Sequence, residues 1–495
     1  MNAKRFFAAV LACLMTIPFA ACEKTPPGED TTAPAATDTT APQETEPAVE
    51  TDEYGREIIP DDIPADLRYD GEEMTIFTRN DNKYWLLEIT ADSDSADVLS
   101  DAVYRRNLTV EDRLGITINV LEEPGTFGKH QVWFNVLRGA WRADDGSIDA
   151  ASVYISQGAI LMTEGMFQNL HNVDTIHLDK PWWNQSFNDE LTVYGKLYGA
   201  VGDMMLSATS MTAMLYFNKN LLADQHGELN LYEVVESGEW TLDYFGNMIM
   251  GGYRDLDGDT APSAGDYYAY KTKRDTMPGD AWPVALGIHA TTKNEDGIPQ
   301  LSFYNERTVE AFEKLAAIYD DEGTTVMDAV KFANGNVLFW SERLAMADTE
   351  LRDVDFEYGI LPMPKLYETD DYATIPRNGH SMLTVLNNAD NIEMVGAALE
   401  LLNAESYRQV TPAFFEITMK RKYLNSEDDA KMFDLILDSN EFNFGYVYSA
   451  TCMGDIAKLM RDPSINIAST WASKEASAQQ MLAELLDTLE GLADD

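Results

Sequence analysis

The chain has 495 residues, of which 84 are acidic and 36 basic, so its formal net charge at pH 7 is −48. This charge repels polyanions and excludes binding of nucleic acid or of anionic lipid surfaces through the body of the protein. The chain is also longer than one hydrophobic core supports. More than one lobe is therefore expected.

Residues 1–21 have the layout of a secretory signal peptide. Lys4 and Arg5 precede an apolar run at residues 6–20, and small residues come before Cys22. The run is too short for a good membrane-spanning helix. The four residues that end at Cys22, FAAC, resemble a bacterial lipobox, which implies that Cys22 carries lipid at the extracellular face of the cell membrane. The alternative is ordinary cleavage that leaves Cys22 free.

Residues 22–66 are expected to form a disordered tether. They are rich in Thr, Pro, Ala and acidic residues and contain few large apolar side chains. Such a segment cannot bury enough surface to offset its ordering entropy. About 40 residues of flexible coil span on the order of 35 Å. Beyond this tether only Cys452 remains as a cysteine, so no internal disulfide is expected.

The globular part is expected to begin at Leu67 with alternating strands and helices. Such an order predicts βαβ units and a largely parallel sheet. Strands are expected at residues 74–77, 115–120 and 149–154, with a helix at 97–114. In parallel sheets, ligands bind at the carboxyl ends of the strands. This rule indicates the following ligand-binding candidates: Arg79, Asn80, Asp81, Tyr154, Ser156 and Gln157.

Residues 332–365 predict a strand, a helix and a second strand. Val337–Trp340 is a short apolar run, apolar residues recur at helical spacing over 344–354, and a second apolar run covers Tyr358–Leu361. Two prolines follow within the next three residues. Because proline cannot continue a central strand, the chain must leave the sheet there.

Several segments resemble extracellular solute-binding lipoproteins of sugar ABC importers, which are distantly similar to maltose-binding protein. They are FANGNVLFW and YGILPMPK in the stretch above, and PWWNQ, GKLYGAVGD, LYFNKNL, GEWTLDYF and TPAFF elsewhere. The resemblance implies an α/β, type II periplasmic-binding-protein-like fold, with two lobes, a crossed hinge and an interlobe cleft. It also implies a monomer without catalytic activity or a required cofactor. Such a protein captures a carbohydrate, an oligosaccharide here, by hinge closure and delivers it to membrane permease subunits.

The same resemblance implies residue boundaries for the two lobes. The crossings are expected at Gly202–Met211 and Tyr358–Lys365. The first lobe would then contain residues 67–208 and 362–390. The second would contain residues 214–357 together with 391–495, whose C-terminal helices return to the second lobe or bridge both. Sugars present apolar C–H faces and hydroxyl rims, so aromatic and planar polar side chains suit them. Further candidates on this basis are Asp203, Tyr216, Trp340, Glu342, Asn378 and Tyr448.

One acidic loop has the spacing of a calcium-binding loop. Asp255, Asp257, Asp259 and Asp266 occupy positions 1, 3, 5 and 12 of twelve residues, and calcium prefers a ring of carboxylate and carbonyl oxygens. Thr260 replaces the glycine that such loops carry at position 6. The sequence therefore predicts a structural calcium ion, with a solvated acidic turn as the alternative.

No catalytic motif stands out. The sequence contains neither H-E-x-x-H nor a phosphate loop, and the segment that starts at Gly379 begins like a nucleophile elbow but lacks its closing glycine. Two alternatives to a sugar receptor remain open at this point. One is a peptide or other solute receptor of the same fold, and the other is a secreted glycan hydrolase built on two of the 84 acids.

Overall fold

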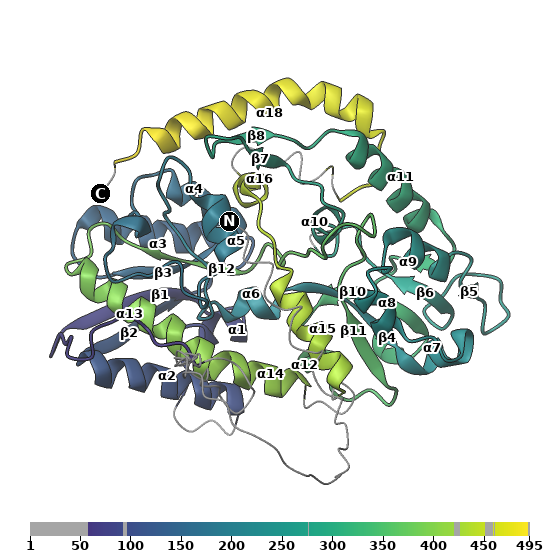
Figure 1. Cartoon of the computed structure of the whole chain (residues 1–495), viewed down its shortest axis with the longest axis horizontal. Coiled ribbons are helices and arrows are strands. Elements are labelled where there is room, and N and C mark those ends of the chain that lie inside the picture. Colours follow the sequence, from purple (N-terminus) through teal and green to yellow (C-terminus); the bar gives the residue numbers. More distant parts are fainter. Residues whose placement is uncertain are drawn as a thin grey trace, which may run out of the picture. The chain divides into compact units, whose positions relative to one another are not determined.

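Two separate β-sheets organise the chain. The computed structural model describes residues 58–92, 97–275, 277–419, 426–450, 459 and 461–493, which all fall within one compact unit, Thr51–Asp495. Figure 1 shows the two sheets with their helices and the long helix α18 (Ile467–Glu490) above both.

The first sheet has the strand order β12-β3-β1-β2. Its strands are β1 (Glu73–Arg79), β2 (Thr117–Glu123), β3 (Ala150–Tyr154) and β12 (Ser381–Val385). Strand β1 is parallel to β2 and β3, whereas β12 is antiparallel to β3. The three strands predicted near the N-terminus are therefore confirmed. Because β12 runs the other way, its first residue, Ser381, lies beside the last residue of β3, Tyr154.

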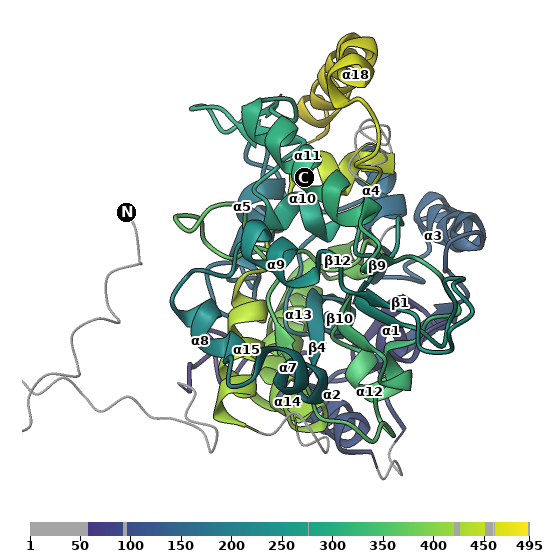
Figure 2. The same cartoon turned by 90° about the vertical axis from the view of Figure 1, so that its right-hand side faces the viewer.

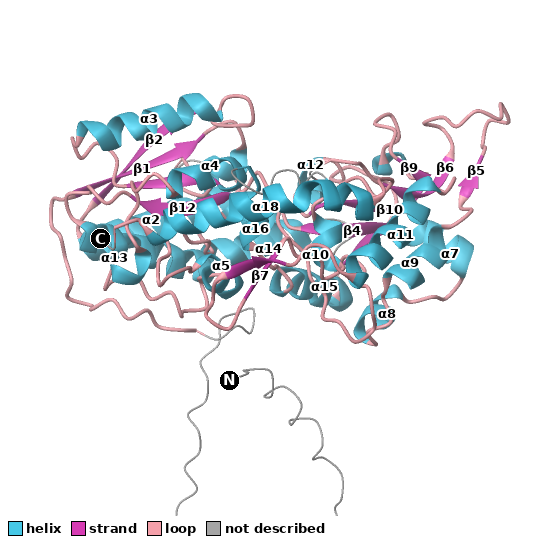
Figure 3. Ribbon diagram, turned by 90° about the horizontal axis from the view of Figure 1, so that it is seen from above, coloured by secondary structure: helices cyan, strands magenta, loops and turns pink. Residues whose placement is uncertain are grey.

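Helices cover both faces of this sheet. Figure 3 shows α3 (His130–Ala143) on one side, and α2 (Val98–Leu114) and α13 (Ile392–Glu405) on the other. Helix α2 ends at Gly115, whose φ of 71° is the left-handed conformation that glycine favours. Helix α13 packs against α2. It therefore lies with the first sheet, although residues 391–495 were expected to lie with the second lobe.

The second sheet has the order β11-β4-β10-β6-β5, with β9 paired to β6. Its strands are β4 (Ala213–Asn218), β5 (Tyr253–Arg254), β6 (Tyr267–Lys271), β9 (Thr324–Thr325), β10 (Val337–Arg343) and β11 (Tyr358–Leu361). Its helices are α7 (Lys219–His226), α8 (Leu231–Glu236), α9 (Leu242–Ile249), α10 (Ala281–Ala285), α11 (Glu306–Asp320) and α12 (Met346–Thr349). The helix expected over 344–354 is thus shorter, and Leu351 and Val354 are buried by turns instead.

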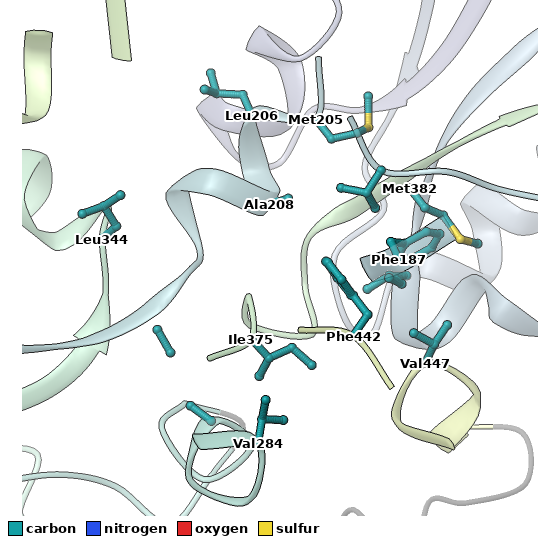
Figure 4. Close-up of a cluster of buried hydrophobic side chains, with 14 of the residues drawn as sticks. Phe187, Met205, Leu206, Ala208, Val284, Leu344, Ile375, Met382, Phe442 and Val447 are labelled. Atoms are coloured by element: carbon teal, nitrogen blue, oxygen red, sulfur yellow. The ribbon is translucent and has the colours of Figure 1, made fainter. Parts of the chain in front are cut away.

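Two antiparallel segments connect the sheets. Arg377 N donates to Met211 O at 2.8 Å, and Ala213 N donates to Ile375 O at 3.3 Å. The first segment follows α6 (Leu206–Ser210). The second passes later than expected, because Tyr358–Leu361 is still paired to β4 in the second sheet. Figure 4 shows that the apolar core continues through this crossing, where Ile375 lies between Phe442 and Val284.

The C-terminal part contacts the surroundings of both sheets. It contains η3 (Ser406–Val410), α14 (Thr411–Met419), α15 (Glu427–Asp438), α16 (Phe444–Val447) and η4 (Tyr448–Ala450) before α18. Helix α15 packs on β11, whereas α16 and η4 pack on α4 (Ile155–Met162). Figures 1 and 2 show α18 and α2 at opposite ends of the fold.

Helix α18 joins the two sides at its two ends. Near its start, the Trp471 ring lies 5.2 Å from that of Phe303, in the segment before α11. Beyond its end, Tyr198 OH donates to Ala493 O at 3.2 Å, and the neighbouring Ala200 is bonded to β12. The hairpin of β7 (Thr291–Lys293) and β8 (Pro299–Leu301) also crosses, since Lys293 Nζ donates to Thr192 O, just past α5 (Gln185–Leu191).

The end of the expected tether is part of the fold. Ile63 is buried, and Asp61 forms ion pairs with Arg113 at 2.7 Å and Arg408 at 3.2 Å. The tether predicted for 22–66 therefore cannot include residues 58–66, because these contacts hold them against α2 and η3. Cys22, Cys452 and the predicted signal peptide lie outside the described residues. Among the helices that are described, none is long and apolar enough to cross a membrane.

Candidate ligand-binding site

The carboxyl end of β1 carries a buried arginine between two aromatic rings. The Arg79 side chain has no exposed surface, and its Cζ lies 3.9 Å from the centre of the Trp85 ring and 4.8 Å from that of Tyr154. Its Nη2 donates to Gly379 O at 3.0 Å and to Ser381 Oγ at 2.9 Å. The guanidinium therefore lies along the sheet edge, from β1 past β3 to the start of β12.

Four polar atoms at this edge are buried without a hydrogen-bond partner in the described part of the chain. They are Nε and Nη1 of Arg79, Nε1 of Trp85 and Oγ of Ser156. An unpaired buried polar group costs roughly 1–3 kcal/mol, and more when it is charged. Such groups are rare in native proteins and are found where a ligand or another group completes them. The cluster is therefore the strongest candidate site at the first sheet.

The charge of Arg79 is only indirectly compensated. Glu88 is buried nearby, but its carboxylate accepts from Ser152 Oγ at 2.9 Å, from Ser207 N at 2.9 Å and from Ser207 Oγ. Burial raises the pKa of Glu88. Burial lowers the pKa of Arg79 to about 10, and the charge of Glu88 opposes that shift. The edge therefore holds a positive charge in a low-dielectric setting.

Local sequence features place these groups. Asn82 caps α1 (Lys83–Leu87) by accepting from Tyr84 N, and this start directs Trp85 toward Arg79. Gly125 lies directly against the arginine stem, since a Cβ there would be 2.6 Å from Arg79 Cγ. Only glycine allows this close approach.

The second sheet also carries a buried cation at the carboxyl end of a strand. Strand β6 ends at Lys271, which is 3% exposed and whose Nζ donates to Met327 O at 2.7 Å. Burial, together with the charges of Lys273 and Lys331, lowers the pKa of Lys271 to about 8. The negative charges of Asp275 and Asp328 oppose this shift, because they raise the pKa of Lys271.

A chain of interacting groups leads from one edge to the other. Tyr446 OH donates to Asp280 Oδ2 at 2.7 Å and interacts electrostatically with Tyr154. Asp275 interacts in the same way with both Asp280 and Lys271. Arg461 Nη2 donates to Asp280 Oδ2 at 2.9 Å, so the charge of that carboxylate is already paired.

Three predicted residues belong to the cluster at the first sheet. Arg79, Tyr154 and Ser156 lie there as expected. Gln157 is half-buried in α4 beside Ser156, and Asn378 is half-buried beside Gly379. The structure thus brings together candidates that the strand-end rule indicated from separate parts of the chain.

Other predicted residues have structural partners instead. Asp81 accepts from Gly125 N, Thr126 N and Lys129 Nζ, so it holds the loop after β2, and Asn80 beside it is exposed. Burial raises the pKa of Asp81, but those hydrogen bonds outweigh it and lower the value. The carboxylate of Asp81 is therefore a structural group.

The aromatic candidates of the second sheet are core residues. Tyr216 is fully buried, donates to Leu344 O at 2.8 Å and accepts from Ala347 N at 3.0 Å. Trp340 stacks on Tyr216 with ring centres 5.5 Å apart. Glu342 is buried and forms an ion pair with Arg343 at 3.4 Å. The hydrogen bonds of Tyr216 engage its hydroxyl within the core, and its role as a ligand-binding residue stays a prediction.

Two further candidates, Asp203 and Tyr448, have partners of their own. Asp203 accepts from Thr411 Oγ1 at 2.9 Å and lines a cavity of about 270 Å³ with Tyr407 and Asn440. Tyr448 is buried, with its ring centre 4.7 Å from that of Phe444.

Trp85, Ser381 and Lys271 were missed by sequence reasoning. Trp85 follows a polar turn, and no pattern distinguishes it from a core tryptophan. Lys271 ends the run YYAYK, where a cation at the end of an aromatic strand was a usable signal. Ser381 is brought to β1 by β12, some 300 residues later in the chain.

The predicted calcium loop is partly assembled. Asp255, Asp257 and Asp259 each offer an oxygen, and these oxygens lie within 4.8 Å of one another. Thr260 has a φ of 64° and thus takes the conformation that glycine has at this position. Asp266 does not join the group, because it accepts from Leu256 N, Ser263 N and Tyr253 OH. Calcium binding stays a prediction.

The fold defined by these sheets and crossings is type II periplasmic-binding-protein-like, which confirms the predicted fold class. No protein-family model matches the sequence, and no curated protein matches it. Many solved structures do match in fold.

The chain is similar in fold to the sugar-binding protein MalE from Xanthomonas citri, with 16% identity, 84% of this chain and 97% of that chain covered, and a TM-score of 0.53. It is also similar to the cyclic alpha-maltosyl-1,6-maltose binding protein from Arthrobacter globiformis, with 16% identity, 84% and 98% covered, and a TM-score of 0.52. A third is the galacto-N-biose-/lacto-N-biose I-binding protein of the ABC transporter from Bifidobacterium longum, with 13% identity, 86% and 98% covered, and a TM-score of 0.51.

Proposed function

We propose that this chain is the substrate-binding lipoprotein of an ABC importer, which captures a carbohydrate between its two lobes and delivers it to a membrane permease. The observation that carries the proposal is the cluster of buried, unpaired donors around Arg79 at the carboxyl end of the first sheet. Ligands of open α/β sheets bind at such ends. The sugar-binding structures of the same fold support the ligand class.

The mechanism is movement of the two lobes about the paired crossing segments. A ligand that contacts both lobes only in the closed state shifts the equilibrium toward that state. Gly379 and Ser381, at the end of one crossing segment, contact Arg79 directly, so the site is coupled to the hinge. Because α18 contacts both sides, hinge movement must also shift α18 against one of them.

The proposed location is the extracellular face of the cell membrane, with attachment through lipid on Cys22. The FAAC sequence at the end of the predicted signal peptide supports this part of the proposal. Mass spectrometry of the membrane-extracted protein should show a mature chain that starts at lipidated Cys22, and a soluble mature chain with a free thiol would contradict it.

A binding screen tests the function. The full chain with Cys22→Ser is incubated with neutral and acidic saccharides, amino acids and peptides, and unfolding is followed by temperature. A ligand at a hundred times its Kd adds about 2.7 kcal/mol of stability. We expect a saccharide hit that is recovered unchanged. Consumption of the saccharide would indicate a hydrolase, and a hit among peptides alone would refute the carbohydrate class.

A pair of serine variants locates the site in the same assay. Ser156→Ala removes the buried hydroxyl that has no partner in the described chain, whereas Ser473→Ala alters an exposed serine of α18. We expect the first variant to weaken the saccharide hit and the second to leave it unchanged. Equal affinities in both variants would place the ligand elsewhere.

A further inference from the structure

We infer that the ligand of this site carries an anionic group, a carboxylate or sulfate, and that Arg79 and Lys271 bind it from the two lobes. The inference rests on the proposed function and narrows its ligand class to acidic saccharides. The inference of an anionic ligand does not come from the sugars named for the structures of similar fold. It comes from the buried positive charges of this chain.

Two buried cations of the described chain stand at the carboxyl ends of strands, one in each sheet. Among the described residues, four lysines and arginines are buried: Arg79, Arg106, Lys271 and Lys365. Arg79 is the last residue of β1, and Lys271 is the last residue of β6. Each of the two sheets therefore presents one buried positive charge at a carboxyl end.

Neither of these two cations has an acidic hydrogen-bond partner in the described structure. Arg79 donates to a carbonyl and a hydroxyl, and Lys271 donates to a carbonyl. A buried charge is normally paired, because desolvation without a partner is costly. In a chain with 84 acidic residues, pairing either cation internally would have needed only one suitable neighbour.

Arg106 shows what a structural arginine looks like in this protein. It is also fully buried, near the same Glu88, and its pKa is lowered to about 9 by burial. Its donors are used by Ser406 Oγ, Ile89 O and Asn107 Oδ1. Arg79 by contrast leaves Nε and Nη1 unpaired, on the edge where ligands of this fold class bind.

The remaining groups at the first sheet are donors as well. Trp85 Nε1 can only donate, and Ser156 Oγ is a hydroxyl. A guanidinium and an indole N–H both require an acceptor, and an anionic oxygen is the strongest one because the hydrogen bond is then charge-assisted. His380, which is close to Arg79, has its pKa lowered to about 3 by burial, so it adds no charge.

The anionic group has to reach Arg79 past Trp85 or Tyr154, whose rings lie against the guanidinium and which are 7% and 6% exposed. Binding should therefore move Trp85 and change its fluorescence. We expect that change in the wild-type protein and its loss in Trp85→Phe, while Trp471→Phe on α18 keeps it.

The test compares matched saccharides that differ only in the charged group. The probes are a galacturonate disaccharide against the corresponding galactose disaccharide, a glucuronate disaccharide against its glucose counterpart, and a sulfated disaccharide against its desulfated form. We expect one acidic member to bind roughly tenfold or more tightly than its neutral partner. The pair that responds tells carboxylate from sulfate. Affinity should also fall when NaCl is raised.

Two variants assign the effect to the proposed residues. Arg79→Met and Lys271→Met should each weaken binding of the acidic saccharide by about 10- to 100-fold, and should weaken binding of its neutral partner by a clearly smaller factor. If Arg79→Met does not fold, Lys271→Met and the matched saccharide pairs on the wild-type protein still test whether the site prefers an anionic ligand. Equal affinities for acidic and neutral partners in the wild type would overturn the inference and leave the sugar receptor standing. Binding of no saccharide at all would overturn the proposed function and this inference together.

Discussion

Arg79 and Arg106 are two fully buried arginines close to the same carboxylate, and they differ in how their donors are used. The donors of Arg106 meet Ser406, Ile89 and Asn107, which fasten α2 to η3 and to the end of the α1 segment. Arg79 keeps two nitrogens without partners. Burial alone therefore does not distinguish a structural arginine from a ligand-binding one. What distinguishes them is whether all of the side-chain donors have hydrogen-bond partners.

The largest expected effect is on folding stability. Arg106→Met removes a fully bonded group and leaves three acceptors unpaired, so it should lower the free energy of unfolding by about 3 kcal/mol. Arg79→Met also removes a desolvated charge with unpaired donors, and it should cost less than about 1 kcal/mol. Denaturant unfolding of the ligand-free variants measures both. Equal losses of unfolding free energy in Arg106→Met and Arg79→Met would contradict the assignment of Arg106 as structural and of Arg79 as ligand-binding.

Gly125→Ala should disturb Arg79 without changing any charge. The new Cβ would lie 2.6 Å from Arg79 Cγ and 2.8 Å from Cδ, so the guanidinium must leave its place between the rings. We expect a loss of about 1–3 kcal/mol in stability and weaker saccharide binding. Gly139→Ala is the matched control, since its Cβ would meet nothing within 4 Å, and unaltered binding in Gly125→Ala would show that the position of Arg79 does not matter.

The pH dependence of Lys271 should act in opposite directions on stability and on binding. Its folded pKa of about 8 lies below the ordinary 10.5, so the unfolded chain holds more protons between these values and stability rises with pH there. Binding of an anion should instead weaken above pH 8, as the charge is lost. The surrounding groups are Lys273, Lys331, Asp275 and Asp328. Measuring both quantities in wild type and Lys271→Met isolates the lysine, and identical profiles would contradict its role.

The smallest effect is expected from calcium. If the loop at Asp255, Asp257 and Asp259 binds the ion, about 1 mM Ca²⁺ should raise the melting temperature by about 2 °C, and Asp257→Asn should remove the increase. Saccharide binding should be the same with and without Ca²⁺, because these residues form no contact with the Arg79 cluster. A calcium-dependent affinity would contradict that separation.

Much of the fold followed from the sequence, because its signals are local. The apolar runs at 74–77, 149–154, 337–340 and 358–361 form strands β1, β3, β10 and β11. The residue boundaries predicted for the two lobes stay a prediction. Helix α13 packs against α2 and β12 of the first sheet. The apolar residues of a helix predict that it is buried on one side, but they do not predict which sheet it packs against.

The site was predicted only in part, for a physical reason. The strand-end rule indicated Arg79, Tyr154 and Ser156, which follow or end their own strands. Their role in ligand binding stays a prediction. It could not separate Asp81, whose carboxylate is used by the loop after β2, from a free carboxylate. The sequence around Tyr216 likewise does not indicate whether its hydroxyl donates to a ligand or, as in the structure, to Leu344 O. Partners brought in by distant segments decide these roles.

The most direct measurement is a crystal structure of the protein with the acidic saccharide that binds most tightly. We expect the anionic group to lie within hydrogen-bonding distance of Nε and Nη1 of Arg79, with Trp85 displaced from its present position and Lys271 approaching from the second sheet. A saccharide bound elsewhere, or one whose charged group faces solvent while Arg79 stays covered by Trp85 and Tyr154, would contradict it.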